Sequence, residues 1–246
     1  MANRIEPPAG ESRENSGSTV IAGILSYLQD RRLQPGDRLP SERDLADRLG
    51  VGRNAVREAL ATLAALRIVE SRPNSGIYLR HVAREGSFEA LILLTELGGS
   101  PTATEVAETM EVRAHLETLA VGLACKRRTD EDLERMADVL SRTQEVLAHG
   151  GNMASDDTDF HVALVGATHN SVLVRVLNAF YRFTGQRREL MFEDLFQAEA
   201  SLSEHRRLLE HVAARDSAKG QLLILRHMDR ARSYWSTVLG RTGSSS

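Results

Sequence analysis

Three histidines and one aspartate stand on the apolar faces of segments whose hydrophobic residues recur at helical spacing. Asp157 and His161 are four residues apart in "DDTDFHVAL" and share a face with Leu164. His205 in "SEHRRLLE" and His227 in "ILRHMDRA" share faces with other apolar residues. One carboxylate and three imidazoles suit Zn²⁺, Ni²⁺, Mn²⁺ or Fe²⁺ and leave coordination positions open. Convergence of the four would indicate a metal site, whereas a lone histidine on such a face is usually a hydrogen-bonded core residue.

A buried cation is expected in the segment 104–126. Arg113 falls near the middle of the apolar face of this segment. The face is formed by Val106, Met110, Leu116, Ala120, Val121 and Ala124. Because an unpaired buried charge is very costly, Arg113 needs a partner. Two partners are open: Glu117 one turn later, or the carboxylate of a bound ligand.

The stretch "LPSERDLADRLGVGRNAVREALATL", residues 39–63, combines regularly spaced arginines with a tight break. Ser41 is a suitable N-cap for a first helix, Gly50 ends it, and a second helix begins near Gly52. This order predicts a helix-turn-helix. Arg38 and Arg48 have acidic neighbours, so we expect them to be solvated or paired rather than bound to DNA.

The second helix of a helix-turn-helix enters the major groove with its first turns, which here present Arg53, Asn54 and Arg57. Arginine suits guanine and phosphate oxygens, and asparagine suits adenine. Arg43, in the preceding helix, is expected to reach DNA as well. The following "RIVESRPNSGIYLR" contains two β-prone runs around a turn at 73–76, so a wing ending near Gly76 should touch the DNA backbone or minor groove.

The remaining pattern is helical, which predicts a mainly α protein with a small β hairpin. A short helix near 87–97 and the break "GGSP" precede helices expected at 104–126, 129–148, 155–168, 170–183, 187–215 (with a break) and 217–239, an all-α bundle. The expected domains are a disordered arm (1–16), a winged helix-turn-helix (17–80), a linker with a short helix (81–101), the helical bundle (102–240) and a disordered tail (241–246).

Bulk properties are those of an ordinary globular protein. The chain has 246 residues, 41% hydrophobic and 26% charged, and its net charge of −3 does not by itself indicate nucleic-acid binding. Its single cysteine, Cys125, excludes an intrachain disulfide. The sequence shows no signal peptide and no apolar run long enough to span a bilayer, so a cytoplasmic protein is expected.

The N-terminal pattern resembles a known family. "PGDRLPSERDLADRLGVGRNAVREALATL", with "GIYL" after the hairpin, is similar to the DNA-binding domain of GntR-type bacterial transcription regulators over about residues 18–80. The resemblance implies that Arg43, Arg53, Arg57 and the wing around Gly76 contact DNA. One departure concerns Gly52, where the family usually has Ser or Thr. Loss of that hydroxyl removes a helix cap and a side-chain contact, which bears on the operator sequence.

The C-terminal part resembles the FCD effector domain of the FadR-like branch of the same family, over about residues 86–239. The resemblance lies in "E-x-R-x-x-L-E" at Glu111–Glu117, "D-x-x-x-H", "E-H" and the last histidine. Metal-binding members use one Asp and three His, which fall on Asp157, His161, His205 and His227. The resemblance also implies that Arg113 contacts a carboxylate of the effector, and the complete metal set favours a small organic acid.

These features predict a ligand-responsive transcription regulator, not an enzyme. We expect a homodimer that binds a palindromic double-stranded operator as a repressor and holds Zn²⁺, with Ni²⁺, Mn²⁺ or Fe²⁺ as alternatives. The rival interpretations are a metal-dependent hydrolase domain fused to a DNA-binding module, and a regulator whose metal is purely structural. Against a hydrolase, we find no second carboxylate or histidine at a defined spacing to serve as general base beyond Asp159 and Glu204, which we expect to face solvent.

Overall fold

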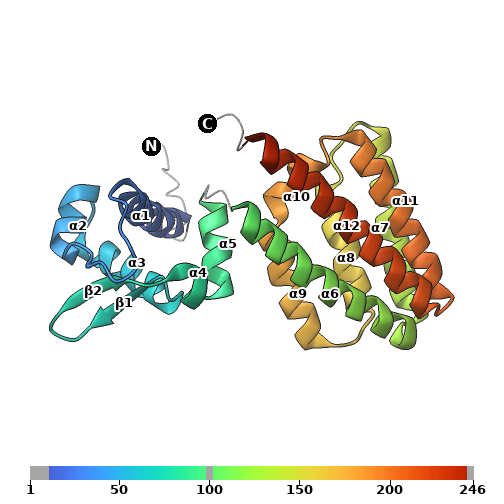
Figure 1. Ribbon diagram of the computed structural model, residues 1–246, viewed down its shortest axis with the longest axis horizontal. Coiled ribbons are helices and arrows are strands. Elements are labelled where there is room, and N and C mark those ends of the chain that lie inside the picture. The colour runs from blue at the N-terminus through green and yellow to red at the C-terminus, as the bar shows by residue number, and fades with distance from the viewer. Residues whose placement is uncertain (1–10, 98–101, 243–246) are drawn as a thin grey trace, which may run out of the picture. The chain divides into compact units, whose positions relative to one another are not determined.

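The computed structural model describes residues 11–97 and 102–242, and the side chains of 17–97 and 102–239. The chain divides into two compact units, one ending at Gly99 and the other beginning at Ser100 (Figure 1). The predicted fold class is confirmed: helices dominate, and the strands found in the described ranges are the two of one hairpin.

The N-terminal unit contains the winged helix-turn-helix. Its elements are α1 (Glu11–Asp30), α2 (Glu42–Leu49), α3 (Arg53–Ala65), β1 (Val69–Arg72), β2 (Gly76–Leu79), α4 (Val82–Glu85) and α5 (Phe88–Glu96). The Ser41 hydroxyl accepts a hydrogen bond from the Asp44 amide at 3.2 Å, which caps α2. Gly50 ends α2 with φ 66°, a left-handed conformation that favours glycine. The two strands pair antiparallel with Arg72 opposite Gly76, so the wing tip lies at 73–75.

One core holds this unit together. It is formed mainly by apolar side chains of α1, α2 and α3 that include Val20, Ile24, Leu28, Leu45, Val56, Leu60 and Leu63. The fully buried Val56 and Leu63 lie on the side of α3 that faces α1, which leaves the opposite side of α3 exposed. The apolar pattern thus fixes which face of α3 can meet DNA.

Three expected boundaries differ from the structure. Helix α1 begins at Glu11, so the disordered arm expected over 1–16 is wrong for 11–16; residues 1–10 lie outside the described part. The segment expected to be a linker is part of the N-terminal unit, because Ala90 of α5 is fully buried in its core. At the other end, α12 extends to Thr242, so residues 241 and 242 of the expected tail are helical and 243–246 are outside the described residues.

The C-terminal unit is a helical bundle. Its helices are α6 (Ala103–Arg127), α7 (Asp130–Ala148), α8 (Ala154–Gly166), α9 (Ser171–Phe183), α10 (Gly185–Met191), α11 (Leu195–Ala213) and α12 (Ser217–Thr242). The break expected within 187–215 occurs at 192–194, where the Asp194 carboxylate caps the first turn of α11 by accepting from the Phe196 amide at 2.9 Å. Capping boxes of Thr102 with Glu105 and of Thr129 with Asp132 begin α6 and α7.

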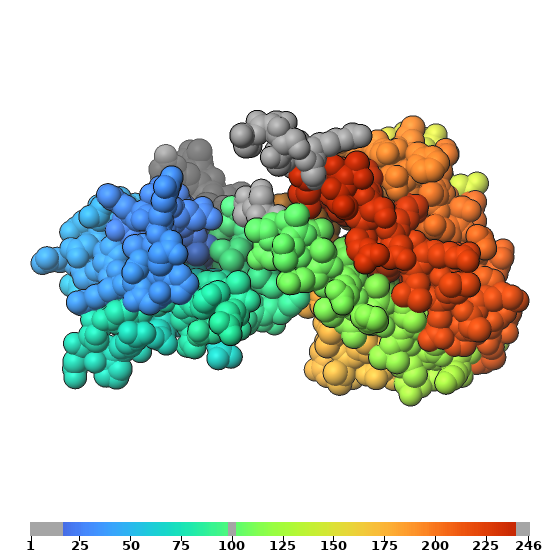
Figure 2. Space-filling model, viewed as in Figure 1, coloured from blue at the N-terminus to red at the C-terminus, as the bar shows by residue number. Residues whose placement is uncertain are grey.

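Helices α6 and α12 pack along each other, with α7, α8 and α11 completing the bundle (Figure 1). In the space-filling view, α12 covers one face of this unit beside α6 (Figure 2). The apolar core between the helices includes Val121, Met136, Phe160, Leu164, Leu208 and Ile224, all at most 1% exposed. A group of polar side chains lies within the same interior. No helix in the described part of the chain combines the length and apolar character needed to cross a bilayer.

Candidate metal centre and DNA-contact residues

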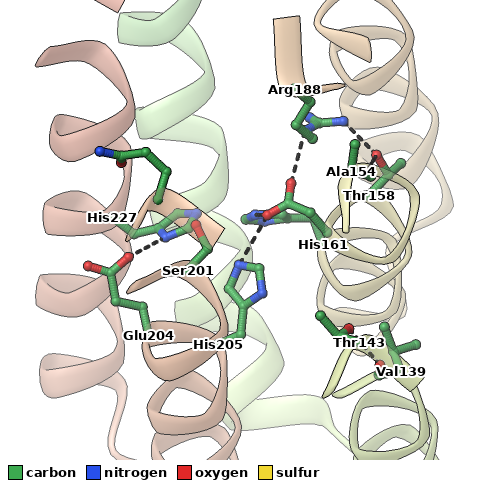
Figure 3. Close-up of polar contacts among 12 residues, drawn as sticks. Val139, Thr143, Ala154, Thr158, His161, Arg188, Ser201, Glu204, His205 and His227 are labelled. Carbon is green, nitrogen blue, oxygen red and sulfur yellow. Dashed lines mark hydrogen bonds and ion pairs between the residues drawn. The ribbon is translucent and has the colours of Figure 1, made fainter. Parts of the chain in front are cut away.

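The four residues expected to bind metal lie together in the interior of the C-terminal unit. Asp157 and His161 come from α8. His205 comes from α11 and His227 from α12, and Figure 3 shows these two histidines close to His161. One potential ligand atom from each lies within 4.8 Å of the others. All four side chains are at most 4% exposed. The predicted convergence is therefore present, brought about by three helices that meet at the same level of the bundle.

Three atoms of this cluster lack hydrogen bonds. Asp157 Oδ1, His161 Nε2 and His205 Nε2 are buried with no hydrogen-bond partner among the described residues. Asp157 Oδ1 lies 3.9 Å from His161 Nε2 and 3.5 Å from His205 Nε2, at or beyond the limit of a hydrogen bond. Buried polar atoms are normally paired, so three orphaned acceptors around one point fit a cation held between them. The donor set of one carboxylate oxygen and three imidazole nitrogens suits a divalent transition metal.

Two carboxylates orient two of the histidines. Glu117 Oε2 lies 3.0 Å from His161 Nδ1. Glu204 Oε2 lies 2.7 Å from His227 Nδ1 (Figure 3). A carboxylate can only accept, so in each neutral histidine the proton sits on Nδ1 and the Nε2 lone pair is free for a metal. Burial raises the pKa of each glutamate, but the hydrogen-bonded histidine and a nearby arginine lower it to about 2. Both carboxylates are therefore ionised at neutral pH.

The remaining ligands are also held in a metal-binding state. Arg188 Nε donates to Asp157 Oδ2 at 2.9 Å, which leaves Oδ1 for the cluster. Burial raises the pKa of Asp157, but His161 and Arg188 outweigh it and keep the pKa below its ordinary value. His205 stacks on Phe160, with ring centroids 4.2 Å apart. Burial, then His227 and His161, hold the pKa of His205 well below 6.5, so this imidazole is neutral at pH 7.

Arg113, the expected effector contact, is buried and paired with Glu117. Its Nε donates to Glu117 Oε1 at 3.0 Å, and Nη2 lies 3.0 Å from the same oxygen without a well-directed hydrogen bond. Tyr181 donates its hydroxyl to that oxygen at 3.1 Å. Arg113 also lines a cavity of about 30 Å³ that Asp157 and His227 share. The ion pair within α6 is thus present, and the arginine still borders the space beside the cluster.

The sequence alone did not predict the hydrogen-bonding partners of the cluster. The expectation that Glu204 faces solvent is wrong: its side chain is 19% exposed and bonds His227 and Arg230. Asp159 is 51% exposed, as expected, and pairs with Arg142. Glu204 lies next to His205 in the chain, so it falls beside the apolar face of α11 rather than on it. Only the packing of α11 against α12 brings Glu204 to His227. Residue spacing along one helix does not predict such a contact between helices.

The expected DNA contacts lie on the exposed side of the helix-turn-helix. Arg43 of α2 and Arg53, Asn54 and Arg57 of α3 are exposed, and Gly76 is half-buried where β2 begins. Arg57 Nη2 lies 3.3 Å from a carboxylate oxygen of Glu42, whereas Arg53 has no ion pair within residues 17–97 or 102–239. Gly52 occupies the N-cap of α3, where no side chain satisfies the free amides.

Arg38 and Arg48 are both exposed, and each also has a neighbour that the sequence did not indicate. Arg48 lies over the ring of Tyr27 at 5.5 Å. Arg38 lies against the wing: its Nε is 2.7 Å from where a Cβ on Gly76 would stand. Gly76 has φ 126°, a conformation that L side chains rarely adopt, which explains glycine at this position. Arg38 is thus placed beside the wing, closer to the expected DNA-contact residues than its sequence neighbours suggested.

Comparisons with known proteins match both units. Residues 17–79 match the family described as bacterial regulatory proteins, gntR family, and residues 108–230 match the FCD domain. The HTH-type transcriptional regulator LutR of Bacillus subtilis is 30% identical over 82% of this chain and 92% of its own length. The Uxu operon transcriptional regulator of Escherichia coli is 29% identical over 87% and 84%, respectively. A putative L-lactate dehydrogenase operon regulatory protein of Escherichia coli is 30% identical over 66% and 62%.

Among solved structures, Lar, which controls the expression of the Listeria monocytogenes agr system, has the same fold. It matches with a TM-score of 0.65 at 18% identity, over 96% of this chain and 100% of that chain.

Proposed function

This chain belongs to the gntR family of bacterial regulatory proteins and carries an FCD domain, and from that premise we propose that a small organic acid controls its binding to DNA at the histidine cluster. The observation that carries the proposal is the set of orphaned acceptors of Asp157, His161 and His205, buried beside a cavity that arginines line. Such a site requires a cation and, next to it, an anion.

The metal would be held by Asp157 Oδ1 and the Nε2 atoms of His161, His205 and His227, with Zn²⁺ as the first candidate and Ni²⁺, Mn²⁺ or Fe²⁺ as alternatives. When bound, it supplies open coordination positions to a carboxylate or hydroxycarboxylate. Glu117 and Glu204 keep two Nε2 lone pairs directed at the cluster, and Arg113 borders the cavity where the acid would lie. The name of the lactate-operon relative supports an acid of the hydroxycarboxylate class.

On the DNA side, we propose a homodimer that acts as a repressor on a palindromic operator, because one recognition helix reads only half of such a site. In this proposal the exposed Arg53 and Asn54 contact bases, and Arg43, Arg57 and the wing at Gly76 contact the backbone. The acid would favour one arrangement of the DNA-binding units over another, typically by ~1–3 kcal/mol of coupling.

The test is a DNA-affinity measurement on the metal-loaded full chain, with a fragment selected from a random library. We expect a small carboxylic or hydroxycarboxylic acid to change the affinity roughly 5- to 150-fold. His161→Ala should abolish this response. If the response survives in His161→Ala, the metal is structural; if no acid of a broad panel changes the affinity, effector control at this site is wrong.

A metal-dependent hydrolase would need a general base beside the cluster. Glu117 and Glu204, the two glutamates that bond its histidines, each also bond an arginine, so neither is free to take a proton from water. This arrangement favours sensing over hydrolysis. Turnover of carboxylate esters or lactones that disappears in His205→Ala would contradict a purely regulatory role.

A further inference from the structure

Three arginines border the small cavity beside the cluster, and they differ in how well they are paired. Arg113, Arg187 and Arg188 line this space of about 30 Å³ together with Asp157 and His227. Arg188 donates to Asp157 at 2.9 Å and to two threonine hydroxyls, and Arg113 is ion-paired with Glu117. These two arginines therefore have anionic or polar partners within the bundle.

Arg187 is the exception. Its Nη1 and Nη2 atoms are buried, and neither has a hydrogen-bond partner among the residues that the structure describes. The guanidinium carbon lies over the ring of Phe183, 4.8 Å from its centroid, a cation–π contact. Burial, then repulsion from Arg113, lower the pKa of Arg187 to about 10, so it is still charged at neutral pH. Arg187 as a whole is half-buried, but two charged guanidinium nitrogens buried without a hydrogen-bond partner are costly unless a bound anion completes them.

The charges around the site leave room for two negative charges. The arginines are Arg113, Arg187, Arg188 and Arg230, and the carboxylates are Glu117, Asp157 and Glu204. Glu105, in the first turn of α6, also attracts the charge of Arg187. Its carboxylate accepts a hydrogen bond from the Thr102 amide at 2.8 Å. With Glu105 included, the positive charges of these arginines equal the negative charges of the carboxylates. The two positive charges of a bound divalent cation would therefore stay uncompensated. A monocarboxylate would cancel only one of them.

We propose that Arg187 binds a second anionic group of the effector, so that the preferred ligand is a small acid with two anionic groups rather than a monocarboxylate. One group lies at the histidine cluster and the other receives the free Nη1 and Nη2 of Arg187. This inference rests on the proposed function and specifies its ligand class. The cavity holds few atoms, but Met110, Met191 and Met228 line it, and their flexible side chains can move to admit a compact ligand.

Matched acids test the second anionic group. Lactate and tartronate differ in carrying a methyl group or a second carboxylate, and glycolate and 2-phosphoglycolate differ by a phosphate. The two pairs distinguish a carboxylate from a phosphate as the second anionic group. In calorimetric titrations of the Zn²⁺-loaded full chain, we expect the acid with two anionic groups in at least one pair to bind roughly 10- to 100-fold tighter than its partner.

The variant Arg187→Gln should remove this preference, because it should lower the affinity for the acid with two anionic groups at least about tenfold more than the affinity for the monocarboxylate. Arg175→Gln, which changes an exposed arginine of α9, serves as the matched control and should preserve the preference. Arg187→Gln should also raise the melting temperature of the ligand-free protein by about 2–4 °C, because it removes an unpaired buried charge.

Equal affinities within both pairs in the wild type, or an equal loss for both members of a pair in Arg187→Gln, would overturn the role of Arg187 while acid binding itself stands. A lower melting temperature of ligand-free Arg187→Gln would likewise count against an unpaired charge. If neither member of either pair binds the Zn²⁺-loaded wild type, the proposal that the ligand is a small acid with two anionic groups is wrong. If acids bind equally to His161→Ala, the proposed function fails instead.

Discussion

Each histidine can serve a metal only if its Nε2 lone pair faces the common centre, and at two positions a carboxylate ensures this. Glu117 accepts from His161 and Glu204 accepts from His227, both through Nδ1. Arg113 and Arg230 in turn bind these carboxylates and keep them ionised. The affinity for metal should therefore depend on residues that never touch it.

The first prediction concerns Glu204. In Glu204→Gln the amide can present its NH₂ to His227, which disfavours the Nδ1-protonated tautomer. We expect Zn²⁺ affinity to fall roughly 10- to 100-fold in a chelator competition. Glu199→Gln changes an exposed glutamate of the same helix and is the control. Unchanged affinity in Glu204→Gln would show that this contact does not orient the ligand.

The second prediction concerns pH. Burial lowers the folded-state pKa of His205 and His227 below the ordinary 6.5, so the unfolded chain binds more protons once the pH falls below about 6.5. The metal-free protein should consequently lose stability as the pH falls from 7.5 to 5. Urea unfolding across this range should show a shallower pH dependence for His205→Gln, but not for the exposed His81→Gln. A slope that His205→Gln leaves unchanged would contradict burial of this imidazole as the cause.

At the residue scale, the sequence predicted which side chains face the interior of the bundle. It did not predict which residues of neighbouring helices contact them. Asp157, His161, His205 and His227 were predictable because each lies on the apolar face of its own helix. Arg187 and Glu204 were not, because each lies beside such a face and acquires its role only through a neighbouring helix. Contacts between helices depend on packing angles that a pattern within one helix does not encode.

At the scale of elements, two glycines two residues apart in the turn before α3 should respond oppositely to the same change. Gly52 has φ −69° and open space where a Cβ would stand, so Gly52→Ser supplies a hydroxyl cap for α3. Gly50 has φ 66°, which L side chains rarely adopt. We expect Gly52→Ser to stabilise by a few tenths of a kcal/mol and Gly50→Ser to destabilise by about 1 kcal/mol, measured by chemical denaturation. Equal signs would mean that the turn differs from the one described.

Helix α3 itself yields a prediction about DNA. Arg53 is exposed in its first turn and has no ion pair among the described side chains, so its guanidinium is available to a base or phosphate. Arg53→Ala should weaken binding to a selected DNA site roughly 5- to 150-fold. Arg206→Ala, an exposed arginine of α11, is the control. Affinity that stays the same for Arg53→Ala at every salt concentration would rule out α3 as the reading helix.

The extents of the helices were largely predictable, and the junction was not. Strong periodicity and capping residues define α6 to α9 to within a few residues of expectation. Around 81–101 the pattern suggested a linker, yet "FEALILL" is apolar enough to bury Ala90 and pack Leu93 and Leu94 against the core of the N-terminal unit. A segment whose apolar residues do not alternate regularly with polar ones does not indicate which unit's core it will pack against.

At the scale of the whole molecule, the chain joins a DNA-reading unit to a bundle that holds a buried charged site. The proposed function depends on that site changing state with metal and acid, because a ligand shifts an equilibrium only by its differential affinity for two states. The family assignment followed from the sequence of both units and was confirmed by comparison. The chemistry of the ligand instead depends on unpaired atoms, which only three-dimensional packing reveals.

The central claim is that Asp157, His161, His205 and His227 form a metal site, and Zn²⁺ titration of the chelator-treated full chain tests it most directly. Calorimetry should show one Zn²⁺ bound per chain, with affinity reduced at least about 100-fold in His205→Ala and unchanged in His81→Ala. An absence of binding in the wild type, or equal binding in wild type and His205→Ala, would contradict the claim.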